Sequence, residues 1–513
     1  MYEINKKQYI VDSRKNYVVA VDIGSSEVVI AVGVIAEGGT INIEALVSEP
    51  VSGVTAGLVD NSQTVAEALR FAREKAEQEV GVAITDAYVS ISGNFVRCAR
   101  FSDHVFVEDS DNRISQRDLA ALRERMRNVK APDGEVIMDL FPLCYKNDVG
   151  AELKNPVGCY SKQLSSTYNF ILCDQTAQDR LRRVFMDAGI KIRGIYAGAA
   201  IVAESLVTSD EKEEGVAVVD IGSGVTDVAI YRGGVLCYIA SIPMGGSAVN
   251  QDIKGYDKSI PSRMVENLKR QCGSAVVALT PDDMIKFQNK GRAIKPIPRL
   301  NLAAVIEARM TDIVEYVWNE IRDAGYAKKL GTGIVLTGGE SNLRNVDELF
   351  RRITEQEVRV ACAEIGISTE SLEHVASPSY ALAVSLLLRG AQTGACPVGV
   401  LIPKKVEPTT VPTSIPTPTP APTPTPTPTP APAEPQIKAE PQPAPAQQRV
   451  VNTPTMPTIE ESDSFDNGDD IADEEDEPKK KGGWFKRLGS KLTQAISNAF
   501  PEPGEDVDGD DEY

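Results

Sequence analysis

The sequence contains one short pattern twice, and this repeat constrains the fold more than any other feature. Residues 19–26 read Val-Ala-Val-Asp-Ile-Gly-Ser-Ser, and residues 217–224 read Ala-Val-Val-Asp-Ile-Gly-Ser-Gly. Each copy is a β-branched run that enters a tight turn and is followed by a second β-branched run, which predicts a strand, a turn and a returning strand. Two copies in the same context indicate two related domains that face each other across a ligand cleft.

The residues of these turns favour phosphate binding. Glycine lets the backbone approach a ligand closely, successive turn amides can point at phosphate oxygens, and serine adds hydroxyl donors. The residues predicted to bind phosphate are Gly24, Ser25 and Ser26 in the first turn and Gly222, Ser223 and Gly224 in the second. Asp22 and Asp220 repel phosphate, so their expected task is to hold Mg²⁺ through its waters.

Two further segments support a nucleotide site. Residues 333–343 form an apolar run that enters Gly338 and Gly339, a turn small enough to accept a base or ribose beside the backbone. Glu266 and Lys269 share one face at helical spacing, where they can contact the ribose and base. Alone, the first segment also fits an ordinary strand-to-helix turn, and the second fits a surface ion pair.

The two hairpins and the Thr-Gly-Gly segment, in this order and spacing, resemble the actin/Hsp70 ATPase superfamily. Ile242-Pro243 before Gly245-Gly246, residues 302–309 and residues 333–339 resemble its FtsA branch of bacterial cell-division proteins. The resemblance implies an α/β, actin-like two-domain fold with a ribonuclease-H-like duplicated core, and ATP and Mg²⁺ as cofactors. It adds Gly245, Gly246 and Asn342 to the expected ATP site, and places adenosine at Gly338 and Gly339.

The resemblance also implies a subdomain plan. Subdomain 1A is expected at 1–84 and 171–212, with the FtsA-type 1C subdomain between them at 85–170. Subdomain 2A is expected at 213–244 and 311–395, with 2B between them at 245–310.

The function that the resemblance implies is an actin-like filament that tethers the tubulin-like GTPase FtsZ to the inner face of the cytoplasmic membrane at the division site and recruits later division proteins. Subdomain 2B would bind the C-terminal peptide of FtsZ, which carries acidic residues, so Arg299 and Arg309 are the candidates for that contact. The family usually has Gly-Gly-Gly-Thr in the second hairpin, whereas Val225 follows Gly224 here. The missing hydroxyl bears on hydrolysis more than on binding, because the amide cradle is backbone, and no water-activating residue is identified. The resemblance implies weak ATPase activity at most.

Other members of the superfamily remain alternatives at this point. A pilus-assembly actin homologue resembles the same core, and MreB-like shape proteins share the cleft with another subdomain plan. An Hsp70-like or kinase-like enzyme would need a substrate domain or a catalytic base, and the sequence offers neither.

Composition excludes several classes of function. The 513 residues carry a formal net charge of −19, which argues against general nucleic-acid binding because phosphate backbones are bound largely by Lys and Arg. Eight scattered cysteines without a Cys-x-x-Cys pair fit a reducing compartment, and two histidines give no basis for a multi-His site. No run is apolar and long enough to span a bilayer, and residues 1–16 do not resemble a secretory signal.

The last quarter of the chain differs in composition. Residues 396–478 are predicted to form a disordered linker, with 19 prolines between Pro397 and Pro457 and then eleven acidic residues in 460–477. Residues 479–500 contain six basic residues and no acidic one, with apolar residues at three- and four-residue steps. A second acidic stretch occupies 501–513.

The segment 479–500 predicts an amphipathic helix for the headgroup region of an anionic membrane. The residues expected to contact the membrane are Trp484, Phe485, Leu488, Leu492, Ile496 and Phe500 on the apolar side and Lys486, Arg487 and Lys491 on the basic side. Docking of this helix on a protein is the alternative. The acidic stretches on both sides either weaken membrane affinity or act only as solvated segments.

Overall fold

The computed structural model describes residues 16–36, 38–286, 288–289, 292–293, 296–394 and 398–400. The Pro-rich and acidic stretch after residue 400, the amphipathic segment 479–500 and the acidic tail lie outside these ranges, as do all nine predicted membrane-contacting residues. Among the described residues, no helix combines the length and apolar character needed to cross a bilayer.

The first domain is built on a five-stranded sheet with the order β12-β7-β1-β2-β3. Its strands are β1 (Tyr17–Ile23), β2 (Glu27–Ile35), β3 (Ile41–Pro50), β7 (Asp86–Ile91) and β12 (Lys191–Ala197). β2 runs antiparallel to both of its neighbours, β1 and β3, whereas β7 and β12 continue the sheet in parallel from β1. All side chains of β7 and the first five of β1 are buried, as expected for central strands of a sheet that is covered on both faces.

The second domain repeats this topology. Its sheet has the order β15-β14-β13-β20-β21, with three antiparallel strands followed by two parallel ones. The strands are β13 (Val216–Ile221), β14 (Thr226–Arg232), β15 (Val235–Ile242), β20 (Ile334–Thr337) and β21 (Val358–Val360). β13 thus corresponds to β1, and β20 corresponds to β7. The duplicated core that the repeated hairpin predicts is present.

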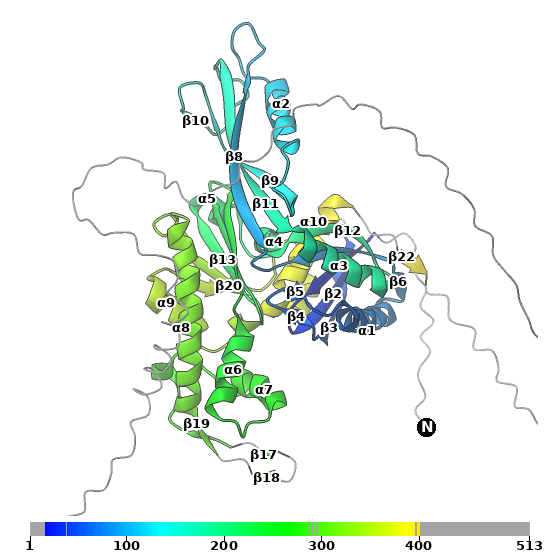
Figure 1. The fold of residues 1–513 in the computed structure, drawn as a ribbon, viewed down its shortest axis with the longest axis vertical. Helices are drawn as coiled ribbons and strands as arrows, with labels where there is room; N and C mark the ends of the chain where they lie inside the picture. Colours follow the sequence, from blue (N-terminus) through cyan, green and yellow to red (C-terminus); the bar gives the residue numbers. More distant parts are fainter. Residues whose placement is uncertain are drawn as a thin grey trace, which may run out of the picture.

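Helices cover both sheets (Figure 1). In the first domain they are α1 (Ser62–Val80), α3 (Gln175–Ala188), α4 (Gly198–Ile201) and α10 (Ala381–Thr393). In the second domain they are α5 (Ser209–Glu214), α6 (Gly246–Tyr256), α7 (Ser262–Cys272), α8 (Arg299–Asp323) and α9 (Val346–Thr354). The last helix of the described residues, α10, packs on β1 and β2, so the chain returns to the first domain, and its apolar run is a buried core helix.

A third unit rises from the first domain between β7 and α3 (Figure 1). It is a four-stranded antiparallel sheet with the order β10-β9-β11-β8 and one covering helix, α2 (Gln116–Arg127). Its strands are β8 (Val96–Phe106), β9 (Glu135–Lys146), β10 (Glu152–Leu153) and β11 (Gln163–Asp174). Leu122 and Met126 of α2 pack on Tyr168 and Phe170 of β11, which gives this unit a core of its own.

The remaining elements are short. The short strands are β4 (Val54–Thr55), β5 (Leu58–Val59), β6 (Val82–Ile84), β16 (Met284–Ile285), β17 (Gln288–Asn289), β18 (Arg292–Ala293), β19 (Ile297–Pro298) and β22 (Val398–Val400). The 3₁₀ turns are η1 (Val202–Ser205), η2 (Val277–Leu279), η3 (Gly339–Asn342), η4 (Thr369–Val375) and η5 (Pro378–Tyr380).

Three predicted boundaries differ from the structure. A unit beginning at residue 85 would include β7, but β7 pairs with β1 and β12 in the first sheet, so the inserted unit begins near β8. A boundary at residue 310 falls inside the continuous helix α8. The stretch from 396 onward was predicted to be linker, yet β22 pairs with β6, so the folded body extends to Val400. Strand pairing decides the first and third of these limits and the continuity of α8 decides the second, so local sequence misses them.

Candidate functional site

A cavity of about 540 Å³ lies between the two domains, and both predicted hairpin turns line it. The predicted residues on its wall are Asp22, Gly24, Ser25, Ser26, Asp220, Gly222, Ser223, Gly224, Glu266, Lys269, Gly338 and Gly339. The structure therefore brings together residues that are separated by more than 300 positions in the chain, from Asp22 to Gly339.

The two turns have matching geometry. The amide of Gly24 donates to the carbonyl of Glu27 at 3.0 Å, and the amide of Gly222 donates to the carbonyl of Val225 at 2.9 Å. The turns also approach each other, because a Cβ on Gly224 would lie 2.4 Å from Oγ of Ser25. Only glycine fits at this position, which explains why the second copy has Gly224 where the first has Ser26.

Buried carboxylates occupy both sides of the cleft. Burial raises the pKa of Asp22 to about 6, although Oγ of Ser90 donates to its Oδ1 at 2.6 Å and opposes the shift. Burial, with repulsion from Asp227 and Asp22, raises the pKa of Asp220 well above its ordinary value. Such a pair is destabilised by its own charge, and a cation between the two sides would relieve that repulsion.

Asp227 is a third carboxylate that sequence reasoning missed. It lies on β14, is 4% exposed, lines the cavity, and accepts a hydrogen bond of 2.5 Å from Oγ of Ser241. Burial raises its pKa. The signal was available, since the equivalent position of the first hairpin is the apolar Val29, and a charged residue in a buried strand usually has a specific role.

The described residues contain no group of three or more His, Cys, Asp or Glu side chains arranged to hold a metal ion directly. Mg²⁺ keeps several waters and takes few carboxylates, so the assignment of Asp22 and Asp220 to a hydrated ion stays a prediction.

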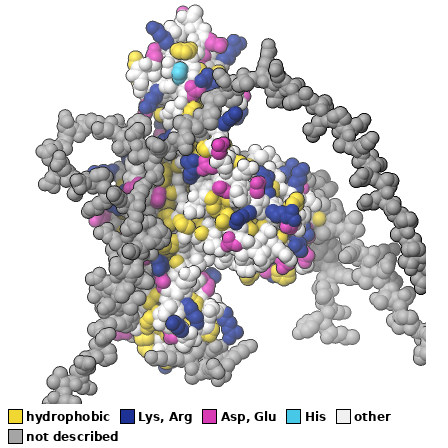
Figure 2. All heavy atoms as spheres, viewed as in Figure 1, with side chains coloured by type: hydrophobic (Ala, Val, Ile, Leu, Met, Phe, Trp, Pro, Cys, Tyr) yellow, Lys and Arg dark blue, Asp and Glu magenta, His cyan; other side chains and the backbone are white. Residues whose placement is uncertain are grey.

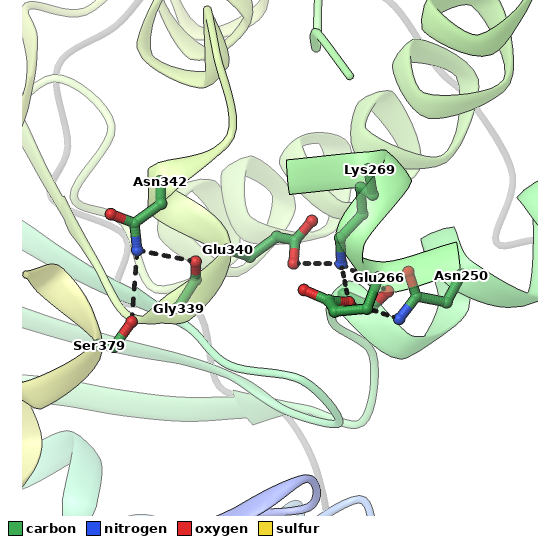
Figure 3. Close-up of polar contacts among 8 residues, drawn as sticks. Asn250, Glu266, Lys269, Gly339, Glu340, Asn342 and Ser379 are labelled. Carbon is green, nitrogen blue, oxygen red and sulfur yellow. Dashed lines mark hydrogen bonds and ion pairs between the residues drawn. The ribbon is translucent and has the colours of Figure 1, made fainter. Parts of the chain in front are cut away.

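One wall of the cavity is organised by a buried lysine (Figure 3). Lys269 is 2% exposed, and its Nζ lies 2.7 Å from Oε2 of Glu340 and 3.0 Å from Oε2 of Glu266. Asn250 donates to Glu266 at 2.7 Å. The pair predicted at helical spacing thus belongs to a network of four residues. No sequence pattern pointed to Glu340, which lies 71 positions from Lys269.

The Gly338-Gly339 turn forms the neighbouring wall. Gly338 has a φ of +88°, and its missing Cβ would lie 2.2 Å from Oδ1 of Asp220, so glycine is required there. Asn342 is exposed and donates to the carbonyl of Gly339 at 3.0 Å and to Oγ of Ser379 at 3.3 Å, so it braces the turn (Figure 3).

Gly245 and Gly246 lie behind the cavity wall. The amide of Gly246 donates to the carbonyl of Gly222 at 3.0 Å, and a Cβ on Gly246 would lie 2.0 Å from Oε2 of Glu340. They support the second hairpin, and neither they nor Asn342 are among the residues that line the cavity. Arg270, which sequence reasoning missed, does line it.

The two arginines predicted to bind a peptide are both engaged within the second domain. Arg299 forms two contacts with Asp283, at 2.5 and 3.1 Å, and lines a second cavity of about 460 Å³. Arg309 has a side chain that is 12% exposed and pairs with Asp252 at 2.6 Å and Asp312 at 3.1 Å. Arg309 therefore joins α8 to α6, which is a structural task.

The duplicated core and its interdomain cavity define the class: this is an actin-like protein. The family model for cell division protein FtsA matches residues 217–385, and the model for the SHS2 domain inserted in FtsA matches residues 93–172, the inserted sheet and helix. Together these matches support an FtsA-type cell-division protein.

Relatives with this description extend over most of the described structure. The chain is 29% identical to cell division protein FtsA of Pseudomonas aeruginosa over 378 residues, which cover 73% of this chain and 89% of the relative. It is 29% identical to that of Escherichia coli K12 over 389 residues, which cover 74% and 91%.

The solved structures include a PilM-PilN type IV pilus biogenesis complex, which matches with a TM-score of 0.50 and 16% identity, over 73% of this chain and 98% of the other. At this identity the likeness supports the actin-like fold alone. The family matches favour cell division, so the pilus-assembly alternative is not favoured.

Proposed function

We propose that this chain is an ATP-binding, filament-forming tether that attaches the FtsZ ring to the inner face of the cytoplasmic membrane at the division site. The observation that carries the nucleotide part is the convergence of two glycine-rich turns and two buried carboxylates on one cavity. The backbone amides of the turns supply donors to phosphate oxygens, and a positive charge would offset the repulsion between the carboxylates.

In this proposal ATP enters with its phosphates between the turns at Gly24 and Gly222 and its adenosine between Gly338 and Lys269. Mg²⁺ would supply positive charge beside the phosphates, with Asp22 and Asp220 as its protein partners through water. Glu266 and Glu340 offer acceptors to ribose hydroxyls, and one oxygen of Glu340, Oε1, is buried without a hydrogen-bond partner.

Hydrolysis is expected to be slow. Val225 replaces the hydroxyl-bearing residue usual in the family, and Thr226 does not substitute for it, because Thr226 is fully buried and donates to the carbonyl of Met244 at 2.9 Å. Binding through backbone amides is unaffected by this change. ATP would therefore control conformation and self-association more than turnover.

The variant Asp220→Asn is expected to raise the thermal stability of the protein without nucleotide and to lower its affinity for ATP with Mg²⁺. Without nucleotide, the variant should melt at a higher temperature than the wild type, by roughly 2–4 °C for each kcal/mol of relieved repulsion. It should also lose the Mg²⁺-dependent part of ATP affinity, at least about tenfold, since one pKa unit of lost interaction is worth about 1.4 kcal/mol. Calorimetric titration of ATP with Mg²⁺ and with EDTA measures the second effect.

The matched control is Asp179→Asn, which removes the same charge from the exposed surface of α3. It should change neither the melting temperature nor ATP affinity. Equal ATP affinity of wild type and Asp220→Asn in the presence of Mg²⁺ would contradict the assignment of Asp220.

For the FtsZ contact we propose the cavity beside Arg299, in the part of the second domain expected to be 2B. Arg299, Arg344, Thr280 and the exposed Leu279 line it or border it, so it combines positive charge with apolar surface. An acidic peptide with apolar residues fits that combination. Arg299→Glu should abolish binding of the C-terminal FtsZ peptide in fluorescence anisotropy, whereas Arg322→Glu at the far end of α8 should not.

The membrane anchor is assigned to residues 479–500, on the basis of their sequence alone. In co-sedimentation with phosphatidylglycerol vesicles, the full chain should pellet with lipid, and a chain truncated after Pro478 should remain in the supernatant. ATP with Mg²⁺ should increase pelleting, because assembly multiplies weak individual anchors. Equal pelleting of both chains would remove the anchor from this segment and favour its docking on a protein.

A further inference from the structure

Helix α2 presents a basic surface in an acidic protein. Residues 113–130 contain six basic and two acidic residues, whereas the whole chain has a net charge of −19. Arg117, Arg123, Arg127 and Lys130 are exposed, and Figure 2 shows dark blue side chains over the upper part of the molecule that α2 and β8 form. Three of them lie on α2 and Lys130 lies three positions beyond its last residue; we call these four residues the α2 basic face.

The fold of the inserted unit does not account for this charge. Asp118, one of the two acids, is buried and serves the helix start, where it accepts hydrogen bonds from Ser115. Arg125 is already paired with Asp103 of β8 at 2.7 Å. In the described part of the chain, Arg117, Arg127 and Lys130 have no ion-pair partner.

Helix stability explains only half of the pattern. A cation near the C-terminal end of a helix is favourable, which suits Arg127, but one in the first turn is unfavourable, and Arg117 is the second residue of α2. Basic residues lie at both ends of the exposed face of α2. This arrangement indicates that their charge serves a contact between this face and a binding partner.

The chain contains a segment with the opposite charge. Residues 460–477 hold eleven acidic residues and no basic one. Contacts between such segments and a cationic surface are individually weak and screened by salt. They become populated when the two partners are joined, because a tether holds them at millimolar effective concentration.

The chain between the folded domains and the acidic run 460–477 is long enough for that run to reach α2. Between the end of β22 at Val400 and Glu460 there are 59 residues. A fully extended chain of that length reaches on the order of 200 Å, and a random chain has an end-to-end distance of roughly 40 Å. The acidic run can therefore reach α2 of its own molecule.

We propose that the α2 basic face binds the acidic run 460–477 of the same chain. The contact would hold the tail against the inserted unit by charge complementarity, with many equivalent acid–base pairings in place of one fixed geometry. It does not depend on nucleotide or on the FtsZ peptide, so it can hold even if either proposal above fails.

Zero-length cross-linking tests this contact directly. A carbodiimide activates a carboxylate, and the amine of Lys130 then displaces the resulting urea to form an amide. In the purified full chain at 50 mM NaCl, mass spectrometry should find Lys130 joined to carboxylates of 460–477, and 500 mM NaCl should remove the link. In the variant Arg117→Glu/Arg127→Glu, the yield of this cross-link should fall at least fivefold.

The matched control is Arg182→Glu/Arg183→Glu on α3, which changes the charge equally on another exposed helix and should leave the link intact. Circular dichroism should show that both variants are folded. Links found only between isotopically distinct copies would overturn the proposal in favour of a contact between molecules. Absence of the link from the wild-type chain, or survival of the link in the α2 variant, would also overturn the proposal. If the link is absent and the α2 variant loses binding to phosphatidylglycerol vesicles, the α2 basic face is a lipid-binding surface instead.

Discussion

Gly338→Ala should destabilise the second domain by about 3 kcal/mol and abolish measurable ATP binding. Gly338 has a φ of +88°, which is strained for alanine by roughly 1–3 kcal/mol. The added Cβ would also lie 2.2 Å from Oδ1 of Asp220 and 2.6 Å from the carbonyl of Ile221, and overpacking of this kind costs about 1–3 kcal/mol more. These close contacts can be relieved only if the second hairpin turn moves.

Thermal unfolding and a titration with fluorescent ATP measure the two effects. The control is Gly339→Ala one position later, where the nearest atom to a Cβ is Oγ of Ser379 at 3.6 Å and φ is negative. That variant should unfold within about 1 kcal/mol of the wild type, since the new contact is an ordinary one. Equal stability of both alanine variants would show that the turn is more tolerant than its geometry implies.

Lys269→Met should cost about 3 kcal/mol of stability, because it leaves a buried carboxylate unpaired. The side chain of Glu340 is only 7% exposed, and its only ion-pair partner among the described residues is Lys269. Burial raises the pKa of Glu340, and the charge of Lys269 opposes that rise. Denaturant unfolding of the wild type and the variant at pH 7.5 measures the loss.

Two measurements show whether the stability lost in Lys269→Met comes from an unpaired charge or from lost packing. The double variant Lys269→Met/Glu340→Gln should recover at least half of the loss, since it removes the charge that was left alone. The deficit of Lys269→Met should also shrink as the pH falls from 7.5 toward 5. In that range the folded variant binds a proton at Glu340, whose pKa is raised, while the unfolded chain with a carboxyl pKa of about 4.3 does not.

A matched ion pair on the surface provides the control. Lys154 pairs with Glu213, and both side chains are largely exposed. Lys154→Met should leave the unfolding midpoint unchanged, because exposed pairs contribute little. A deficit of Lys269→Met that stays constant with pH would indicate packing, and would argue against an ionised Glu340.

The subdomain division follows from strand pairing and remains a proposal. We propose that 1A comprises the β1-containing sheet with α1, α3 and α10, that 1C comprises residues from β8 to β11, and that 2A comprises the β13-containing sheet. Subdomain 2B would comprise α6, α7 and the short strands before α8. The FtsA resemblance predicted the order of these units, while their limits depend on which strands bond to one another.

The sequence predicted the two matching turns because their geometry is local. Gly24, Ser25, Gly222 and Ser223 each lie in a turn formed by neighbouring residues, so a short pattern contains the information, and phosphate binding by the turn amides stays a prediction. The repeat of that pattern also predicted the duplicated core, since one motif in one strand context folds in one way.

Only the tertiary structure revealed the residues that act across the cleft. Glu340 pairs with Lys269 from another element, and Asp227 approaches Asp22 from the opposite domain. The pairing of Arg309 with Asp252, which joins α8 to α6, is likewise revealed only by the tertiary structure, and a contact of Arg309 with the FtsZ peptide stays a prediction. The sequence by itself determined which donor and acceptor groups each turn and helix face offers. The packing of the two domains decided which charges meet, because burial and distance depend on residues far apart in the chain.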